Sequence, residues 1–174
     1  MNRLEKLLEN KRKNLLAVYF TAGFPKKDST VEVIDALCAA GADIIEIGIP
    51  FSDPMADGVV IQHSSNVALQ NGMSLRLLLE QVAEGRLRNP DTPFVAMGYL
   101  NPIMQMGAEP FFHNAKEAGI DAVIIPDLPF DILHQVPSVI SLSSRYGITP
   151  HTPTQNHMCP TKAYGFLSYI HTYL

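Results

Sequence analysis

Short, continuously apolar runs alternate along this chain with stretches of amphipathic spacing, and that alternation constrains the fold more than any other feature. Residues 15–21 (Leu-Leu-Ala-Val-Tyr-Phe-Thr) form an apolar run of strand length, and residues 43–49 form another. Such runs are typical of parallel strands that are covered on both faces. The same pattern predicts strands at 94–98 and 122–125 and, more weakly marked, at 147–150 and 165–170.

Amphipathic stretches between these runs predict the helices. Ser29 and Glu32 have the spacing of a capping box at the start of one helix, and Gly41 stands where that helix ends and a left-handed residue is favoured. Pro110 falls in the first turn of another predicted helix, and Pro137 interrupts the last one. The helices are predicted around residues 4–8, from 29 to 40, and at 60–69, 75–86, 109–118 and 131–145.

The chain repeats one building block. Residues 40–45 (Ala-Gly-Ala-Asp-Ile-Ile) return as residues 118–123 (Ala-Gly-Ile-Asp-Ala-Val), each time a helix-ending glycine followed by a buried strand. Repeated βα units indicate a barrel or a doubly wound sheet, and no Gly-rich dinucleotide fingerprint follows the first strand. The 174 residues fall below the roughly 200 that a full barrel needs. We therefore predict an α/β fold of the (β/α)8 TIM-barrel type, incomplete at about six of eight βα units, as a single domain over residues 1–174.

Composition and charge exclude several functions. Hydrophobic residues make up 47% of the chain and charged residues 17%, as in ordinary globular domains, and the net charge of −4 includes no basic face for nucleic acid. No apolar run approaches the roughly 20 residues of a membrane span, and residues 1–6 lack a signal-peptide core. Cys38 and Cys159 form no disulfide framework, and His151, His157 and Cys159 lack a fourth ligand for zinc. We expect a cytoplasmic protein that binds no nucleic acid, no membrane and no metal.

Candidate chemistry lies where polar residues interrupt or follow the predicted strands, because barrel active sites lie at the C-terminal ends of the strands. Glu46 stands inside an apolar run, where a carboxylate is either paired or has a raised pKa suited to acid–base work. Asp53 and Asp57 lie in the Pro- and Gly-rich loop that follows, where a rigid polar site and a structural turn are both open. The segments 99–102 and 126–129 follow the next two strands and are predicted as turns or site loops.

Residues 46–58 (Glu-Ile-Gly-Ile-Pro-Phe-Ser-Asp-Pro-Met-Ala-Asp-Gly) resemble the signature of the tryptophan synthase alpha subunit family. Shorter matches follow in the family's order and spacing at 20–23, 98–102 and 124–129. The resemblance covers residues 15–130, and the long motif with both acids is highly specific. It implies a (β/α)8 barrel of the carbon–oxygen lyase class. Its reaction in tryptophan biosynthesis is a retro-aldol cleavage of indole-3-glycerol phosphate to indole and glyceraldehyde 3-phosphate.

The resemblance also implies roles for individual residues. Glu46 corresponds to the acid/base that transfers protons, and Asp57 to the partner of the indole N–H. Other matched positions line or adjoin the indole pocket: Tyr19, Ile61, Met97, Tyr99, Ile124 and Asp127. Positions that face the beta subunit in the family's α2β2 heterotetramer are Asp53, Asn101 and Pro102. The pyridoxal phosphate of that complex belongs to the beta subunit, so the alpha chain is expected to need no cofactor.

The match weakens after residue 130, and residues 147–174 diverge. No segment before Leu174 corresponds to the family's mobile loop after strand six or to its phosphate-binding units, whose backbone N–H groups hold the substrate. We therefore expect little or no lyase activity from the chain as it stands. A noncatalytic partner of the beta subunit is an alternative. Another phosphosugar barrel enzyme is a third, against which the motif at 46–58 argues.

Overall fold

The computed structural model of the chain describes residues 1–11, 13–128 and 137–151. Its helices are α1 (Arg3–Asn10), α2 (Ser29–Ala39), α3 (Val59–Gln70), α4 (Leu75–Arg88), α5 (Leu100–Met106), α6 (Ala108–Glu117) and α7 (Pro137–Tyr146). Its strands are β1 (Ala17–Thr21), β2 (Ile44–Gly48), β3 (Phe94–Met97), β4 (Ala122–Ile124) and β5 (Thr149–His151). The first five predicted strands are therefore confirmed.

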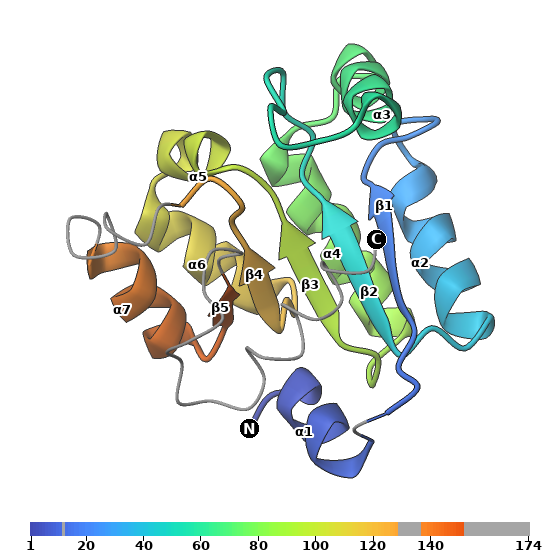
Figure 1. Cartoon of the computed structure of the whole chain (residues 1–174), viewed down its shortest axis with the longest axis vertical. Helices are drawn as coiled ribbons and strands as arrows, with labels where there is room; N and C mark the ends of the chain where they lie inside the picture. The colour runs from blue at the N-terminus through green and yellow to red at the C-terminus, as the bar shows by residue number, and fades with distance from the viewer. Residues whose placement is uncertain (12, 129–136, 152–174) are drawn as a thin grey trace.

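The strands form one parallel sheet in the order β1-β2-β3-β4-β5, so each strand pairs with the next one along the chain (Figure 1). Helices α2, α4 and α6 lie on one side of this sheet, and α7 packs beside α6. A doubly wound sheet reverses its strand order at one point, whereas a (β/α)8 barrel does not. The observed order confirms the prediction of a barrel-type α/β fold, of which the described residues form a part.

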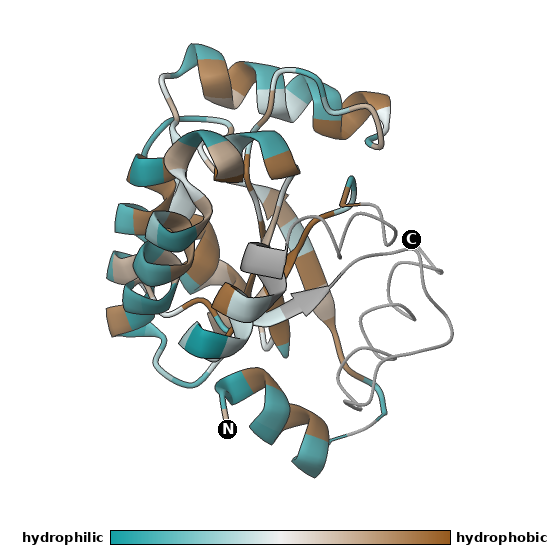
Figure 2. Cartoon of the chain, turned by 90° about the vertical axis from the view of Figure 1, so that its left-hand side faces the viewer, coloured by the Kyte–Doolittle hydropathy of each residue, from teal (hydrophilic) through white to brown (hydrophobic). Residues whose placement is uncertain are grey.

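Apolar side chains cover both faces of the sheet, which is why the strands are continuously apolar in sequence. Successive residues of a strand point to opposite faces. Ile45, Ile47 and Phe94 belong to the larger core, which the helical layer covers. Ile44 and Val95 belong to a second cluster on the other face, which in a barrel is the inner one. In Figure 2 the helices carry polar and apolar bands, as amphipathic helices do, while the strands are mainly apolar.

The repeated sequence block folds into the same local structure twice. Gly41 ends α2 and Gly119 ends α6, with φ angles of +87° and +84°. In both copies the N–H of the residue after the glycine donates a hydrogen bond to a carbonyl oxygen of the preceding helix, at 3.1 and 2.9 Å. This is the left-handed helix ending that glycine favours because it has no Cβ. The prediction for Gly41 is confirmed, and Gly119 follows the same rule.

Each block also carries an aspartate that binds the start of the neighbouring strand. Asp43 accepts a hydrogen bond from the N–H of Leu16, just before β1, at 2.9 Å. Asp121 accepts one from the N–H of Phe94, the first residue of β3, at 3.1 Å. Because each aspartate stands directly before its own strand, it ties together the N-terminal ends of two adjacent strands.

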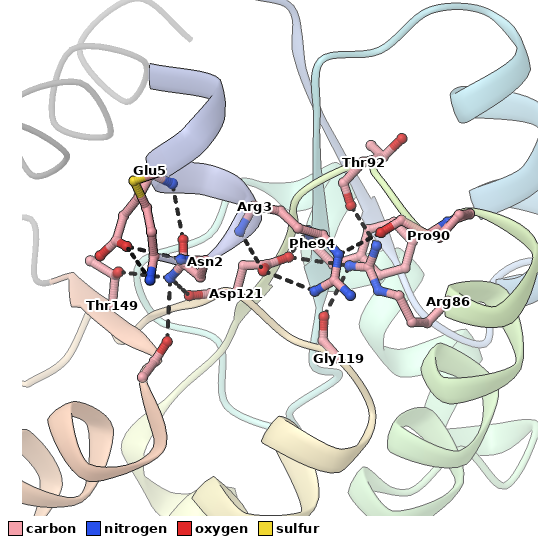
Figure 3. Close-up of polar contacts among 12 residues, drawn as sticks. Asn2, Arg3, Glu5, Arg86, Pro90, Thr92, Phe94, Gly119, Asp121 and Thr149 are labelled. Carbon is pink, nitrogen blue, oxygen red and sulfur yellow. Dashed lines mark hydrogen bonds and ion pairs between the residues drawn. The ribbon is translucent and has the colours of Figure 1, made fainter. Parts of the chain in front are cut away.

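Asp121 is also the centre of a buried polar cluster at this end of the sheet (Figure 3). Its side chain is 2% exposed and pairs with Arg86 Nη2 and Arg3 Nη1, each at 3.2 Å. The Arg86 guanidinium stacks on the Phe94 ring, with 3.7 Å between its Cζ and the ring centroid. Asn2 Nδ2 donates to the Asp121 carbonyl at 3.0 Å. These contacts join α1, α4, β3 and β4, and they hold α1 across the lower end of the sheet in Figure 1.

The capping box predicted at Ser29 is wrong. Asp28 occupies the N-cap position of α2, and its side chain makes no cap hydrogen bond. The Ser29 hydroxyl instead accepts a hydrogen bond from the N–H of Lys26 at 3.3 Å. A capping box does occur at α1, where Asn2 and Glu5 bind each other's backbone N–H groups. The local spacing of residue types therefore identified the helix but not the residue that caps it.

The segment 99–102, predicted as a turn or site loop, is in fact the beginning of α5, with Tyr99 at its N-cap. As far as the structure describes it, α7 begins at Pro137, so the predicted interruption there stays a prediction. Residues 131–136 and 152–174, with the sixth predicted strand and most of the predicted divergent tail, lie outside the described residues. No helix in the described ranges has the length and apolar character that crossing a membrane requires.

Candidate active site

Glu46 and three of the predicted pocket residues share the inner face of the sheet. Tyr19 of β1 and Glu46 of β2 are direct partners in register. Met97 of β3 and Ile124 of β4 are partners in the next row, which also contains Gly48 of β2. Residues paired in this way point to the same face of a sheet. The four side chains therefore converge near the C-terminal ends of their strands.

Glu46 is buried, and one of its carboxylate oxygens lacks a partner. The residue is 2% exposed, and its Oε1 atom has no hydrogen-bond partner among the described residues. Burial raises the pKa of Glu46 from 4.5 to about 7, because apolar surroundings disfavour the charged form. A carboxyl group that is half-ionised near neutral pH can both give and take a proton. These surroundings give Glu46 the properties that a general acid/base needs.

Replacing Glu46 with glutamine is expected to stabilise the fold above neutral pH. The pKa is 4.5 for the ordinary group and about 7 in the folded chain, so between these pH values the unfolded state releases a proton that the folded state keeps. The wild-type free energy of unfolding therefore falls as pH rises through this window, by up to about 3 kcal/mol. Urea unfolding should show a more stable Gln variant at pH 8 and no such gain at pH 4. An equal pH dependence of both proteins would contradict the burial of an ionising carboxyl.

Asp57 lies in the loop between β2 and α3, which Tyr99 holds in place. The Tyr99 hydroxyl accepts a hydrogen bond from the N–H of Ala56 at 2.9 Å, and its ring lies 5.3 Å from that of Phe51. Partial burial raises the pKa of Asp57, while a hydrogen bond with the Tyr99 side chain acts in the opposite direction. The Asp57 N–H donates to the carbonyl of Pro54 at 3.0 Å, so the loop is also a turn. The two interpretations of this loop, a turn and a polar site, are compatible.

Two other predicted pocket residues lie differently. Asp127 is exposed, and its Oδ1 accepts the N–H of Leu100 at 2.8 Å. It therefore caps the first turn of α5 from a distant part of the chain. Ile61 is half-buried in the first turns of α3, directly after the Asp57 loop. Their roles beside a bound substrate stay predictions.

The residues predicted to face a partner lie on two neighbouring segments. Asp53 and Asn101 are exposed, and Pro102 is half-buried. Pro102 and Ser52 line one surface cleft of about 470 Å3 between the β2–α3 loop and α5. The structure therefore brings the start of α5 alongside the loop that carries Asp53. Whether a partner binds there stays a prediction.

Three residues near the site were not identified from the sequence. Thr21 Oγ1 and Ser64 Oγ lie 2.7 Å apart and join the end of β1 to α3. Gly48 leaves room for Tyr19, because a Cβ on Gly48 would lie 2.6 Å from the Tyr19 Cζ atom. A glycine inside a strand pattern is a signal for such a close approach. The Thr21–Ser64 pair has no local signal, since its members are brought together only by the fold.

A metal centre finds no support in the described part of the chain. No group of three His, Cys, Asp or Glu side chains that could hold a metal ion occurs within residues 1–11, 13–128 and 137–151. Two of the residues once considered as ligands, His157 and Cys159, lie outside those ranges.

Comparison with known sequences places this architecture in one family. The family model for the tryptophan synthase alpha chain matches residues 4–157. The tryptophan synthase alpha chain of Bacteroides fragilis is 55% identical over 130 residues, which are 75% of this chain and 49% of the relative. That of Christiangramia forsetii is 44% identical, with 96% of this chain and 66% of the relative covered. The chain spans about half the length of most of the curated relatives it matches.

Solved structures agree with the sequences. Tryptophan synthase subunit alpha from Legionella pneumophila has a TM-score of 0.80 and 40% identity, over 87% of this chain and 58% of that one. The aminoacrylate-bound form of tryptophan synthase from M. tuberculosis has a TM-score of 0.79 and 29% identity, over 90% of this chain and 64% of that one. The strands of the parallel sheet pair in chain order, and the family model matches residues 4–157; membership of one family explains both observations. The chain belongs to the tryptophan synthase alpha chain family.

Proposed function

We propose that this chain is part of an alpha subunit of tryptophan synthase and carries the acid–base residues for the cleavage of indole-3-glycerol phosphate to indole and glyceraldehyde 3-phosphate. The observation that carries the proposal is Glu46, a buried carboxyl group with an unpartnered oxygen and a pKa of about 7. Its position near the C-terminal ends of the strands is where barrels of this kind carry out chemistry. Family membership supplies the substrate class.

The cleavage needs one proton delivered and one removed. A proton must reach C3 of the indole ring before the bond to the glycerol carbon can break. The glycerol hydroxyl beside that bond must lose a proton as it becomes the aldehyde. Glu46 suits both transfers, because its acid and base forms are both populated near pH 7. The electrons of the broken bond restore the indole ring, so no redox partner is required.

Asp57 suits a different task. Protonation of the ring at C3 makes the indole N–H more acidic, and a carboxylate that accepts a hydrogen bond from it stabilises the developing positive charge. Asp57 is partly buried, and the Tyr99 contact restrains its loop. Tyr19, Met97 and Ile124, on the same face as Glu46, and Ile61 on α3 would form the apolar surround of the indole ring.

A second candidate function is binding to the beta subunit without catalysis. Met55 is 92% exposed, Val59 80% and Val60 74%, all in the Asp57 loop or the first turn of α3. Exposed apolar side chains that form a contiguous patch often mark an interaction surface, whereas single exposed apolar residues do not. We infer that this surface, with Asp53 beside it, contacts the beta subunit, which carries the pyridoxal phosphate of the complex.

One experiment separates the two functions. Indole release from indole-3-glycerol phosphate is measured for the chain alone and with a tryptophan synthase beta subunit, and complex formation is measured in parallel. Cleavage in either condition supports the lyase, whereas binding without cleavage supports the noncatalytic partner. Val60→Asp should weaken binding, while Leu87→Asp, at a similarly exposed apolar position on α4, should not. If the chain shows neither cleavage nor binding, both candidate functions are overturned.

A further inference from the structure

The Asp57 backbone is held by hydrogen bonds on both sides of its Cα atom. On one side, the Asp57 N–H donates to the carbonyl of Pro54, a buried residue, at 3.0 Å. On the other side, the Asp57 carbonyl accepts a hydrogen bond from the side-chain Nε2 of Gln62 at 2.8 Å. Fixing the two peptide planes that flank a residue fixes its φ and ψ, the only soft backbone dihedrals, and with them the direction of its Cα–Cβ bond. These two bonds therefore set the direction in which the Asp57 side chain leaves the backbone.

Packing does little to hold this part of the loop. The residues on either side of Asp57, Ala56 and Gly58, are exposed, and so are the next ones out, Met55 and Val59. Asp57 itself is partly buried, and this burial raises the pKa of its carboxyl group. The carboxyl group therefore lies on the inward side of the loop. Because few buried contacts hold the loop there, its hydrogen bonds keep Asp57 in place.

Gln62 stands on a helix that is itself anchored to the sheet. It belongs to the first turn of α3, which lies beyond the C-terminal ends of β1 and β2 (Figure 1). Two residues further along α3, Ser64 Oγ lies 2.7 Å from Thr21 Oγ1 at the end of β1. After the last turn of α3, Asn71 Nδ2 donates to the carbonyl of Gly23 at 3.0 Å. Gln62 therefore ties the Asp57 carbonyl, through α3, to the strand that carries the other side of the pocket.

The contact that Gln62 makes depends on its amide group. A carbonyl oxygen can only accept a hydrogen bond, so the Gln62 atom that faces it is the amide nitrogen, which can only donate. This bond goes to the backbone of Asp57, so it leaves the carboxyl group free for a ligand. The bond from the Ala56 N–H to the Tyr99 hydroxyl, at 2.9 Å, holds the preceding peptide in addition.

We propose that Gln62 is a positioning residue: its amide group holds the Asp57 carbonyl and so directs the Asp57 carboxyl toward the place where the indole N–H would lie. The importance of this direction for catalysis rests on the proposed function. The restraint on Asp57 does not, and it can be measured without substrate.

The first test uses Gln62→Met, which removes the donor and keeps the length of the side chain. Hydrogen exchange of the Asp57 N–H, followed by NMR, should become about 5-fold faster, the effect of losing one hydrogen bond. The pKa of the Asp57 carboxyl, followed through its carboxyl carbon, should fall toward its ordinary value of 3.8, because a released carboxyl is better hydrated. Its titratable neighbours Tyr19 and Tyr99 stay neutral in this range, since burial raises the pKa of both.

Gln70→Met is the matched control, because it makes the same change at an exposed position on the same helix. It should leave both the exchange rate and the titration of Asp57 as in the wild type. An unchanged exchange rate in Gln62→Met would overturn the proposal, and so would an Asp57 pKa that rises or stays the same.

Activity with the beta subunit present gives a second readout that a merely structural role would not produce. Gln62→Met should lower kcat for indole release by about 10-fold and leave KM within about 2-fold, because the aligned carboxyl acts mainly in the transition state. In an Asp57→Ala background the Gln62 change should add nothing, since its effect acts through the Asp57 carboxyl. A further loss in that double variant would indicate a general structural role and contradict positioning.

Failure of this inference and failure of the proposed function give different results. If exchange and titration behave as expected but the wild-type chain releases no indole even with a beta subunit, the restraint on Asp57 stands and the lyase proposal falls. If the wild-type chain cleaves the substrate but Gln62→Met matches it in exchange, titration and kcat, the lyase stands and the positioning role falls.

Discussion

Glu46→Gln is expected to reduce indole release from indole-3-glycerol phosphate by at least about 100-fold, the lower end of what a general acid–base group contributes. Glutamine keeps the shape of the side chain and cannot transfer a proton. The variant should fold normally and, as argued above, be more stable than the wild type at pH 8. Loss of activity with a gain in stability is a combination that misfolding cannot produce.

The control for this experiment is Glu80→Gln, which makes the same chemical change at an exposed position on α4. It should retain wild-type turnover and wild-type stability. Both variants are assayed with the beta subunit present, at saturating substrate and at low substrate, so that kcat and KM are separated. Near-normal turnover of Glu46→Gln would remove Glu46 from the mechanism, whatever the control shows.

Asp121→Ala is expected to lower the free energy of unfolding by about 3–5 kcal/mol, the range for breaking a buried ion pair by removing one partner. The substitution leaves the Arg86 guanidinium, on a residue that is 8% exposed, without its carboxylate. It also removes the acceptor of the Phe94 N–H at the start of β3. Urea unfolding at neutral pH measures the loss directly.

Two variants sharpen this prediction. Asp121→Asn keeps one oxygen acceptor but loses the charge, so it should lie between Asp121→Ala and the wild type. Glu117→Ala, at an exposed acid near the end of α6, should change the free energy of unfolding by no more than about 0.5 kcal/mol. A loss of less than about 1 kcal/mol in Asp121→Ala would mean that the buried cluster does little to hold the strands together.

The strands and most helices could be predicted from sequence because their signals are local. Residues 43–49 are apolar in succession since β2 is covered on both faces, and a single carboxylate in that run drew attention to Glu46. α5 was missed because Asn101 and Pro102 resemble a turn. Its first turn is capped by Asp127, which lies in the turn after β4 and outside any local window around α5.

The site was predictable to the same extent. The proline and glycine residues of the Asp57 loop predicted a turn from the sequence, and the family resemblance predicted which residues line the pocket. The Thr21–Ser64 hydroxyl pair required the packing of α3 against the end of β1. The Asp121 cluster likewise required α1 and α4 to meet at one point. Polar groups that act through partners distant in sequence are visible only once the fold is known.

The hydrogen bonds that Asp43 and Asp121 accept from neighbouring strands lie at one end of the sheet, and the candidate active site lies at the other. They fasten the N-terminal ends of neighbouring strands, whereas Glu46 and the Asp57 loop occupy the opposite ends. A four-residue strand separates the two ends by roughly 13 Å, beyond the reach of direct contact. Loops at the reactive end can therefore change in length and chemistry while the anchoring of the strands is undisturbed. A chain built in this way can acquire a new substrate without first acquiring a new scaffold.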